Sequence, residues 1–339
     1  MPPLNTYNSL PHLIIYHQTH HYSDGTPRSI LPLITQPNIS ITHVIIAAIH
    51  LHDPPENIKL NDHEPSHPRN RTLWAEIRAM QLSGIKVLGM LGGAAKGTYA
   101  RLDQDDANFE IYYKPLKGFI EEKEFDGLDL DVEEEMSLSG IIRLIDRLKA
   151  DFGEDFLITM APVATALLSD EPKYNLSGFS YEALEVMKGN QIAWYNTQFY
   201  CGWGDISNTD TFDQIIAHGY PANKITIGLV TNPENGSGWI PHNILQEILL
   251  NLTTRYPNLC GIMGWEYFNS LPGGTERPWE WAANMTRYIR NGQSQNPTQR
   301  HKLLGFSALW ALADFNIKQS EGEAPKPDAF DYFSENEEV

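Results

Sequence analysis

The sequence predicts a single (β/α)8 barrel, in which eight parallel strands are surrounded by helices. Short apolar runs rich in Val and Ile recur along the chain, as they do in buried parallel strands, at intervals of roughly 30–45 residues. Helical periodicity fills several of the gaps between them. An alternation of this kind is typical of an α/β fold with a parallel sheet. The predicted strands are residues 12–17, 43–52, 86–93, 125–133, 156–163, 193–200, 224–230 and 261–268.

The clearest helical pattern is GIIRLIDRLKADFG, at residues 140–153. Its apolar residues recur at the i, i+3, i+4, i+7 spacing of an amphipathic helix, and Gly153 is a plausible C-terminal stop. Residues 72–84 and 242–256 show the same kind of pattern. In the helix predicted over residues 140–153, the apolar positions are Ile141, Leu144, Ile145 and Leu148.

The main rival on this pattern is an open, doubly wound sheet. That fold is disfavoured because no glycine-rich dinucleotide fingerprint or phosphate loop follows the first strand. The middle of the chain contains no linker, so we predict one barrel domain over residues 1–315. Residues 316–339 form an acidic, Pro-containing tail that we expect to be disordered.

Composition and charge narrow the class of protein. The chain has 339 residues, of which 41% are hydrophobic and 20% are charged, as in a soluble globular protein with a sizeable core. Its formal net charge of −18 disfavours a nucleic-acid or anionic-membrane partner. The sequence lacks a membrane-length apolar run and an N-terminal signal pattern, so we expect a cytoplasmic protein. A secreted protein is the alternative if the gene start is misassigned.

Metal sites are disfavoured by the Cys and His spacing, and we expect no metal or other cofactor. Cys201 and Cys260 lack the spacing of zinc ligands, and Cys260 lies in an apolar run as a core residue would. His50 and His52 end the second predicted strand as a His-x-His pair. The later strands offer no histidine partners, so we interpret this pair as polar residues of the barrel rim.

The fourth predicted strand carries a column of acidic residues. Side chains alternate along a strand, so Asp129, Asp131 and Glu133 point the same way. In a barrel this direction is the interior, and the C-terminal end of the strand is where catalytic groups lie. The residues between them, Leu128, Leu130 and Val132, are expected to face the helices.

Three neighbouring carboxyl groups cannot all ionise at low cost, so some share protons or have raised pKa values. A carboxyl group that stays protonated near neutral pH is a general acid, as cleavage of a glycosidic bond requires. A calcium loop starting at Asp129 is disfavoured because Glu134 stands where such a loop needs Gly. A Mg²⁺ site remains an alternative. We interpret Glu134 and Glu135 as solvated loop charges, and Asp126 as a supporting residue.

The segment DGLDLDVE, at residues 126–133, matches the D-x-x-D-x-D-x-E signature of glycoside hydrolase family 18, which contains chitinases and endo-β-N-acetylglucosaminidases. The resemblance extends over about residues 12–290. LGMLGG resembles the family's Ser-x-Gly-Gly motif, although Met90 replaces the usual Ser. YNTQFY and GWEYFNS resemble the strand-six and strand-eight motifs. The closest resemblance is to the fungal endo-β-N-acetylglucosaminidases.

The resemblance implies a retaining hydrolysis in which the 2-acetamido group of the substrate is the nucleophile. Glu133 would then be the acid and later the base. Asp131 would orient the acetamido group and stabilise the oxazolinium charge, and Asp129 would tune Asp131 by sharing a proton. Tyr200 would hydrogen-bond the acetamido carbonyl.

The resemblance also implies sugar-binding positions. Trp265 would form the floor of the sugar site, where an aromatic face suits the apolar underside of a pyranose ring. Further candidates for substrate binding are Gln198, Asn196, Gly92 and Gly93. Four tryptophans in predicted loops or helix starts are weaker candidates, namely Trp203, Trp239, Trp279 and Trp281.

Three functions are compatible with this resemblance. They are an endo-β-N-acetylglucosaminidase that cuts N-glycan cores, a chitinase, and an inactive sugar-binding protein, which is disfavoured because Glu133 is present. Val132, where chitinases often carry Trp, favours the endoglycosidase, as does the short interval between the seventh and eighth strands. No carbohydrate-binding appendage is visible. We therefore expect a monomer that acts on N-glycans, glycoproteins or free oligosaccharides.

Overall fold

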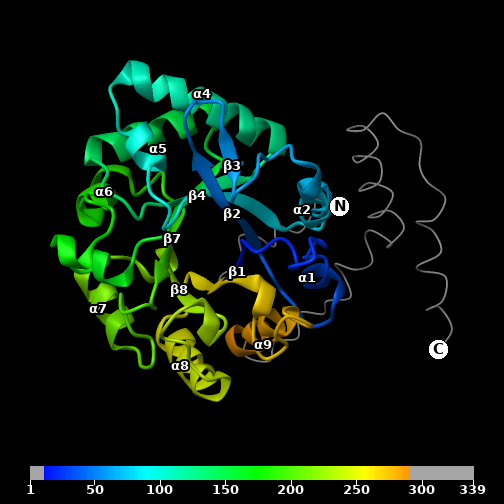
Figure 1. The fold of residues 1–339 in the computed structure, drawn as a ribbon. Coiled ribbons are helices and arrows are strands. Elements are labelled where there is room, and N and C mark those ends of the chain that lie inside the picture. Colours follow the sequence, from blue (N-terminus) through cyan, green and yellow to red (C-terminus); the bar gives the residue numbers. More distant parts are fainter. Residues whose placement is uncertain (1–10, 291–339) are drawn as a thin grey trace, which may run out of the picture.

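The strands close into a barrel because β1 (His12–His17) pairs in parallel with both β2 (His43–Leu51) and β9 (Gly261–Trp265). The structure is a computed structural model that describes residues 11–290. Figure 1 shows the strands at the centre and the helices around them. This arrangement confirms the predicted (β/α)8 barrel and excludes the open sheet. The predicted tail, residues 316–339, and both ends of the predicted domain 1–315 lie outside the described residues.

Each predicted strand is present, with slightly different ends. The strands are β1 (His12–His17), β2 (His43–Leu51), β3 (Ile58–Leu60), β4 (Lys86–Gly92), β5 (Gly127–Asp131), β6 (Leu157–Met160), β7 (Trp194–Gln198), β8 (Ile225–Val230) and β9 (Gly261–Trp265). The sequence pattern missed β3, which pairs antiparallel with the end of β2 at the rim. All the other strand pairs are parallel.

The helices lie around the outside of the barrel between successive strands, except for the last described helix, which follows β9 (Figure 1). They are α1 (Pro32–Thr35), α2 (Arg71–Leu82), α3 (Thr98–Leu102), α4 (Asp106–Lys123), α5 (Leu138–Phe152), α6 (Tyr181–Lys188), α7 (Asp210–His218), α8 (His242–Arg255) and α9 (Trp279–Ile289). In α5 the hydroxyl of Ser137 caps the first turn by accepting the Gly140 amide, and Gly153 is the C-cap that stops the helix, as predicted. Within residues 11–290, no helix is long and apolar enough to cross a membrane.

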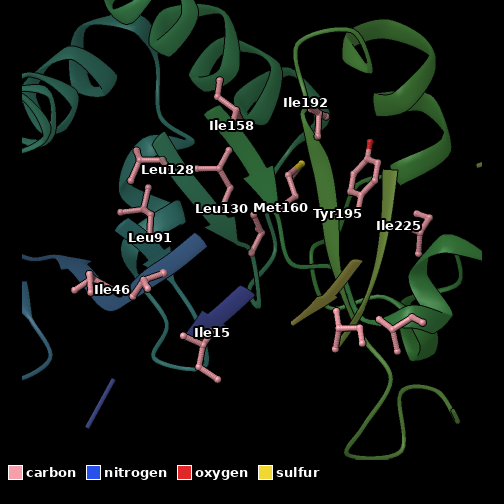
Figure 2. Packing of buried hydrophobic residues seen from close by; sticks show 14 of the residues in the cluster. Ile15, Ile46, Leu91, Leu128, Leu130, Ile158, Met160, Ile192, Tyr195 and Ile225 are labelled. Atoms are coloured by element: carbon pink, nitrogen blue, oxygen red, sulfur yellow. The ribbon is translucent and has the colours of Figure 1, made fainter. Parts of the chain in front are cut away.

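The core has two layers, separated by the strands. Leu128 and Leu130 point from β5 toward the helices and belong to the outer layer, as Figure 2 shows. Full burial of each contributes about 1.5–3 kcal/mol to folding. The inner layer fills the barrel and includes Tyr16, Met90 and Cys260, so the prediction that Cys260 is a core residue is confirmed. Strand alternation therefore divides β5 into an apolar outer face and an acidic inner face.

Glu76 is a buried carboxyl group on α2 whose titration should affect the stability of the fold. It accepts the Ile30 amide at 2.8 Å, and burial raises its pKa from 4.5 to about 7. Folding therefore favours the protonated form. The stability that this group contributes is complete below about pH 4.5 and is lost as the pH rises to about 7. At about 1.4 kcal/mol per pKa unit, the loss is about 3 kcal/mol.

The substitution Glu76→Gln cannot ionise but keeps an acceptor for the Ile30 amide. It should remove about 3 kcal/mol from the difference in unfolding free energy between pH 4.5 and pH 7.5, as measured by urea denaturation. Glu247→Gln, on the exposed face of α8, is the matched control and should leave the difference unchanged. A Glu76→Gln protein with the pH dependence of the wild type would contradict this interpretation.

Candidate active site

The acidic column points into the barrel at the C-terminal ends of the strands. Asp129 and Asp131 are inward-facing residues of β5, and both are buried. The strand ends at Asp131, so Glu133 lies two residues beyond it, and its side chain still reaches Gln198 of β7. Strand register places Asp129 beside Met90 of β4 and Thr159 of β6.

Asp129 lies at the bottom of the column and accepts three hydrogen bonds. The hydroxyl of Tyr16 donates to Oδ2 at 2.6 Å, and the hydroxyl of Thr159 donates to Oδ1 at 2.6 Å. The side-chain amide of Asn196 also donates to Oδ1, at 2.9 Å. Four strands thus meet at one carboxyl group. Asn196, predicted as a substrate-binding residue, contacts Asp129.

Gln198 connects the two upper carboxyl groups of the column. Its Nε2 donates to Oδ1 of Asp131 at 3.3 Å and to Oε1 of Glu133 at 3.1 Å. The same nitrogen lies 3.0 Å from the carbonyl oxygen of Ala161. An amide nitrogen has only two hydrogens for these three acceptors, so its hydrogen bonds can shift when either carboxyl group changes its protonation.

The environment of the column disfavours charge on its buried members. Burial, followed by the charges of Glu133 and Asp129, raises the pKa of Asp131 well above its usual range. Burial also raises the pKa of Asp129, although its hydrogen bonds from Thr159, Tyr16 and Asn196 oppose this shift. Asp131 is therefore a group that gains stabilisation on ionising when positive charge develops beside it.

Aromatic side chains form the upper wall of the barrel interior. Tyr200, just beyond β7, belongs to the inner layer, and burial with the charges of Asp131 and Glu133 raises the pKa of its hydroxyl. This hydroxyl therefore stays a hydrogen-bond donor. Trp265 ends β9, is half-buried, and packs edge-on to Tyr16 with ring centroids 5.4 Å apart. Trp239, in the β8–α8 loop, also packs against this inner layer.

Gly92 and Gly93 allow β4 to approach β5 closely. Both have positive φ angles, of 92° and 90°. A Cβ atom at Gly92 would lie 2.5 Å from the carbonyl oxygen of Asp131 and 2.4 Å from the ring of Tyr99. The amide of Gly93 donates to the same carbonyl oxygen at 2.9 Å. These glycines position the backbone of Asp131, and their predicted contact with substrate stays a prediction.

The structure corrects the interpretation of Glu134 as a solvated charge. Its side chain is buried, with 8% exposure, and its two oxygens accept the amides of Gly97 and Tyr99. Glu135 is exposed, as predicted. Asp126 is a supporting residue, as predicted, because it pairs with Lys86 and accepts the Val87 amide.

The four tryptophans that were weaker candidates lie in different places. Trp281 is buried in the outer core, so it is wrong as a substrate contact. Trp203 and Trp279 are half-buried and pack against the same outer core. Of the four, Trp239 packs against the interior. The packing of the other three against the outer core is not visible from local sequence, because each lies in a loop or at a helix start.

The column does not have the donor set of a cation site. Among residues 11–290, no cluster of three or more His, Cys, Asp and Glu side chains is arranged to hold a metal ion. Both oxygens of Asp129 already accept hydrogen bonds from neutral donors. His50 lies at the end of β2, beside His52 and half-buried. The oxygen atoms of the column therefore fit proton chemistry better than Mg²⁺ ligation.

The sequence pattern missed three side chains that build the site. Tyr16 and Thr159 bind Asp129, and each is a polar residue on the inward phase of an otherwise apolar strand, which is a usable signal. Glu266 follows Trp265 directly and accepts hydrogen bonds from the backbone amides of Gln18 and Thr19. Its partners come from the loop after β1, so no local pattern reveals it.

A closed (β/α)8 barrel with carboxyl groups at the C-terminal end of one strand is an arrangement typical of glycosidases. The chain matches the family Glycosyl hydrolases family 18 over residues 12–296 and belongs to that family. It is thus a glycoside hydrolase with a chitinase-like barrel, as the resemblance implied.

Known proteins of two specificities are similar to this chain. A fungal endo-β-N-acetylglucosaminidase of family 18 is 50% identical, with a TM-score of 0.80 over 84% of this chain and 100% of that chain. The chitinase ChiC from Aspergillus fumigatus is also 50% identical, with a TM-score of 0.75 over 81% of this chain and 98% of that chain. Chitinase 2 of Rhizopus oligosporus is 29% identical over 213 residues, which are 57% of this chain and 36% of that chitinase. This chain therefore matches only about a third of the length of that relative.

Proposed function

We propose that this protein is an endo-β-N-acetylglucosaminidase that hydrolyses the bond between the two GlcNAc units of N-glycan cores. The observation that carries the hydrolytic part of the proposal is the pair Asp131 and Glu133, which Gln198 joins. The similarity to a fungal endo-β-N-acetylglucosaminidase supports the substrate class. The connection from β8 to β9 supports it too, since it contains α8 and no inserted domain.

The proposed reaction uses the substrate's own acetamido group as the nucleophile. Glu133 donates a proton to the leaving oxygen as the C1–O bond breaks, and the acetamido oxygen bonds to C1. Asp131 passes its proton to Asp129, and the resulting carboxylate stabilises the charge of the oxazolinium ion, while the Tyr200 hydroxyl donates a hydrogen bond to the acetamido oxygen. Glu133 then takes a proton from the water that attacks C1, which restores the acetamido group and retains the configuration.

A chitinase is the second candidate function, and the similarity to ChiC at the same identity favours it. The reaction chemistry would be the same, because a chitin chain and an N-glycan core both present a GlcNAc–GlcNAc bond. The two functions differ in the groups that flank this bond. The choice therefore depends on the rim loops rather than on the acidic column.

Mass spectrometry of two substrates incubated side by side with the protein tests the proposal. One substrate is a high-mannose Asn-linked glycopeptide and the other is a chitin pentamer. A peptide that keeps a single GlcNAc, with the pentamer intact, is the expected result. A cleaved pentamer with an intact glycopeptide would make the protein a chitinase. No cleavage of either would favour a sugar-binding protein.

Trp265→Ala should raise KM for the cleaved substrate by about 10-fold or more, because loss of about 1.4 kcal/mol of sugar stacking is a factor of ten. Trp265→Phe keeps an aromatic face and should recover part of the loss. Trp279→Ala is the matched control, since Trp279 packs on the outer core. Steady-state kinetics would contradict the role of Trp265 if the two alanine variants had the same KM.

A further inference from the structure

Glu133 lies outside any strand, so the structure around it must hold its backbone in place. The strand β5 ends at Asp131, and α5 begins only at Leu138. The side chain of Glu133 has one protein hydrogen bond among residues 11–290, from Gln198. A general acid must keep its oxygen within hydrogen-bond reach of the leaving group. The other contacts of residues 131–136 therefore decide where this oxygen lies.

Glu134 makes the strongest of these contacts. Its Oε2 accepts the Gly97 amide and its Oε1 accepts the Tyr99 amide, both at 2.7 Å. Hydrogen bonds from backbone amides to an ionised carboxylate are stronger than those between neutral groups. Tyr99 belongs to the outer core, whereas Glu133 contacts Gln198 at the end of β7, so the two adjacent glutamates are held on different sides of the segment.

The segment bound by Glu134 returns to the catalytic strand. The Tyr99 hydroxyl donates to the carbonyl oxygen of Leu91 at 2.7 Å, and its ring packs on Gly92. Gly93 then donates to the carbonyl oxygen of Asp131 at 2.9 Å. The contacts from Glu134 through Tyr99 to Asp131, together with the backbone of residues 131–134, form a closed ring that includes the backbone of Glu133.

Two further contacts hold the same segment from the other side. The hydroxyl of Ser177 donates to the carbonyl oxygen of Val132 at 2.6 Å, and the Met136 amide donates to the carbonyl oxygen of Ser177 at 3.0 Å. Ser177 thus fixes the backbone before and after the three consecutive glutamates, residues 133–135. Glu134 differs from Ser177 in that it binds through a carboxyl group and joins the segment to the first turn of α3.

We propose that Glu134 is a positioning residue, which holds Glu133 at the height where it can protonate the leaving oxygen. The proposal rests on the proposed glycosidase function, because it assigns Glu133 as the acid. It predicts a defect that depends on how much acid assistance the leaving group needs. A sugar hydroxyl needs a proton in order to leave, whereas a dinitrophenolate leaves readily without one.

The test compares two substrates that have the same sugar but different leaving groups, GlcNAc or 2,4-dinitrophenol. Glu134→Leu should lower kcat/KM by about 10²-fold for the GlcNAc leaving group, the size of effect that a misplacement of about 1 Å produces. In the same variant, kcat/KM for the dinitrophenyl substrate should fall by less than about 3-fold, which is the size of effect that small changes in ground-state binding produce. Glu134→Gln keeps one acceptor and should give an intermediate loss. Glu135→Gln, at the exposed neighbouring position, is the matched control and should leave both substrates unaffected.

Hydrogen–deuterium exchange supplies a readout that does not depend on activity. Peptides that contain the amides of Gly97 and Tyr99 should exchange faster in Glu134→Leu than in the wild type or in Glu135→Gln. Equal losses on the two substrates, or unchanged exchange, would overturn the proposal. If the wild type cleaved neither substrate, the proposed function would fail, and the exchange result would still decide whether Glu134 holds this segment.

Discussion

Glu133→Gln is expected to lower kcat/KM on a GlcNAc-linked substrate by about 10²–10⁴-fold, the usual contribution of general acid–base catalysis. The amide keeps the size of the side chain, and its oxygen can still accept the hydrogen bond from Gln198 that Glu133 accepts at 3.1 Å. What it loses is the acidic proton. The folded structure and substrate binding should therefore change little while turnover falls.

The measurement is steady-state kinetics on the substrate that mass spectrometry identifies, with the dissociation constant of a chitobiose ligand measured in parallel. Glu135→Gln serves as the control here as well, since it makes the same chemical change at an exposed position two residues along. A Glu133→Gln protein with near-normal turnover would contradict its assignment as the acid.

Asp131→Asn should have the second large effect, a loss of about 10²–10³-fold in kcat, as when one preorganised stabilising group of a transition state is removed. Asn cannot supply the negative charge that the oxazolinium ion needs. Its amide can also orient the acetamido group wrongly. The side-chain volume is unchanged, so the loss should come from chemistry rather than from packing.

The same variant should lose activity without losing stability. Burial and the neighbouring charges raise the pKa of Asp131, so the folded state disfavours its ionised form. At pH values above the unfolded pKa of an Asp, near 3.9, this group makes the fold less stable than a neutral isostere would. Asp131→Asn should therefore have an unchanged or higher free energy of unfolding at neutral pH.

A thiazoline that mimics the bicyclic oxazolinium ion separates the chemical role from other effects. The affinity of Asp131→Asn for this thiazoline should fall in parallel with kcat, whereas its affinity for the reaction product should change little. A variant that is less stable and that binds both ligands weakly would instead indicate a structural role for Asp131.

Much of the barrel could be predicted because its signals are local. The inward and outward phases of β5 follow from alternating residues, and α5 follows from its apolar spacing and from Gly153. The strand β3 was missed because three residues are too few to show a period. Short pieces that pair at a rim depend on their neighbours rather than on their own sequence.

The acidic column was also predictable, whereas its supporting residues were not. Asp129, Asp131 and Glu133 stand out because charge interrupts an apolar strand. The partners of Glu134 and Asp129 are 35 and 113 residues away along the chain, at Tyr99 and Tyr16. A carboxylate that is buried against distant backbone amides looks the same in a sequence as one in solvent.

The closing pair of strands has a consequence for synthesis of the chain. β1 begins at His12 and its partner β9 begins at Gly261, so about 250 residues separate the two sides of this seam. At about 5–20 residues per second, a ribosome needs roughly 12–50 s to make that interval. During this time the nascent chain carries an unpaired, apolar edge at β1, which is the kind of edge that pairs with other chains. We expect slow translation or premature termination before residue 261 to favour aggregation, because the last strand is the one that removes the exposed edges.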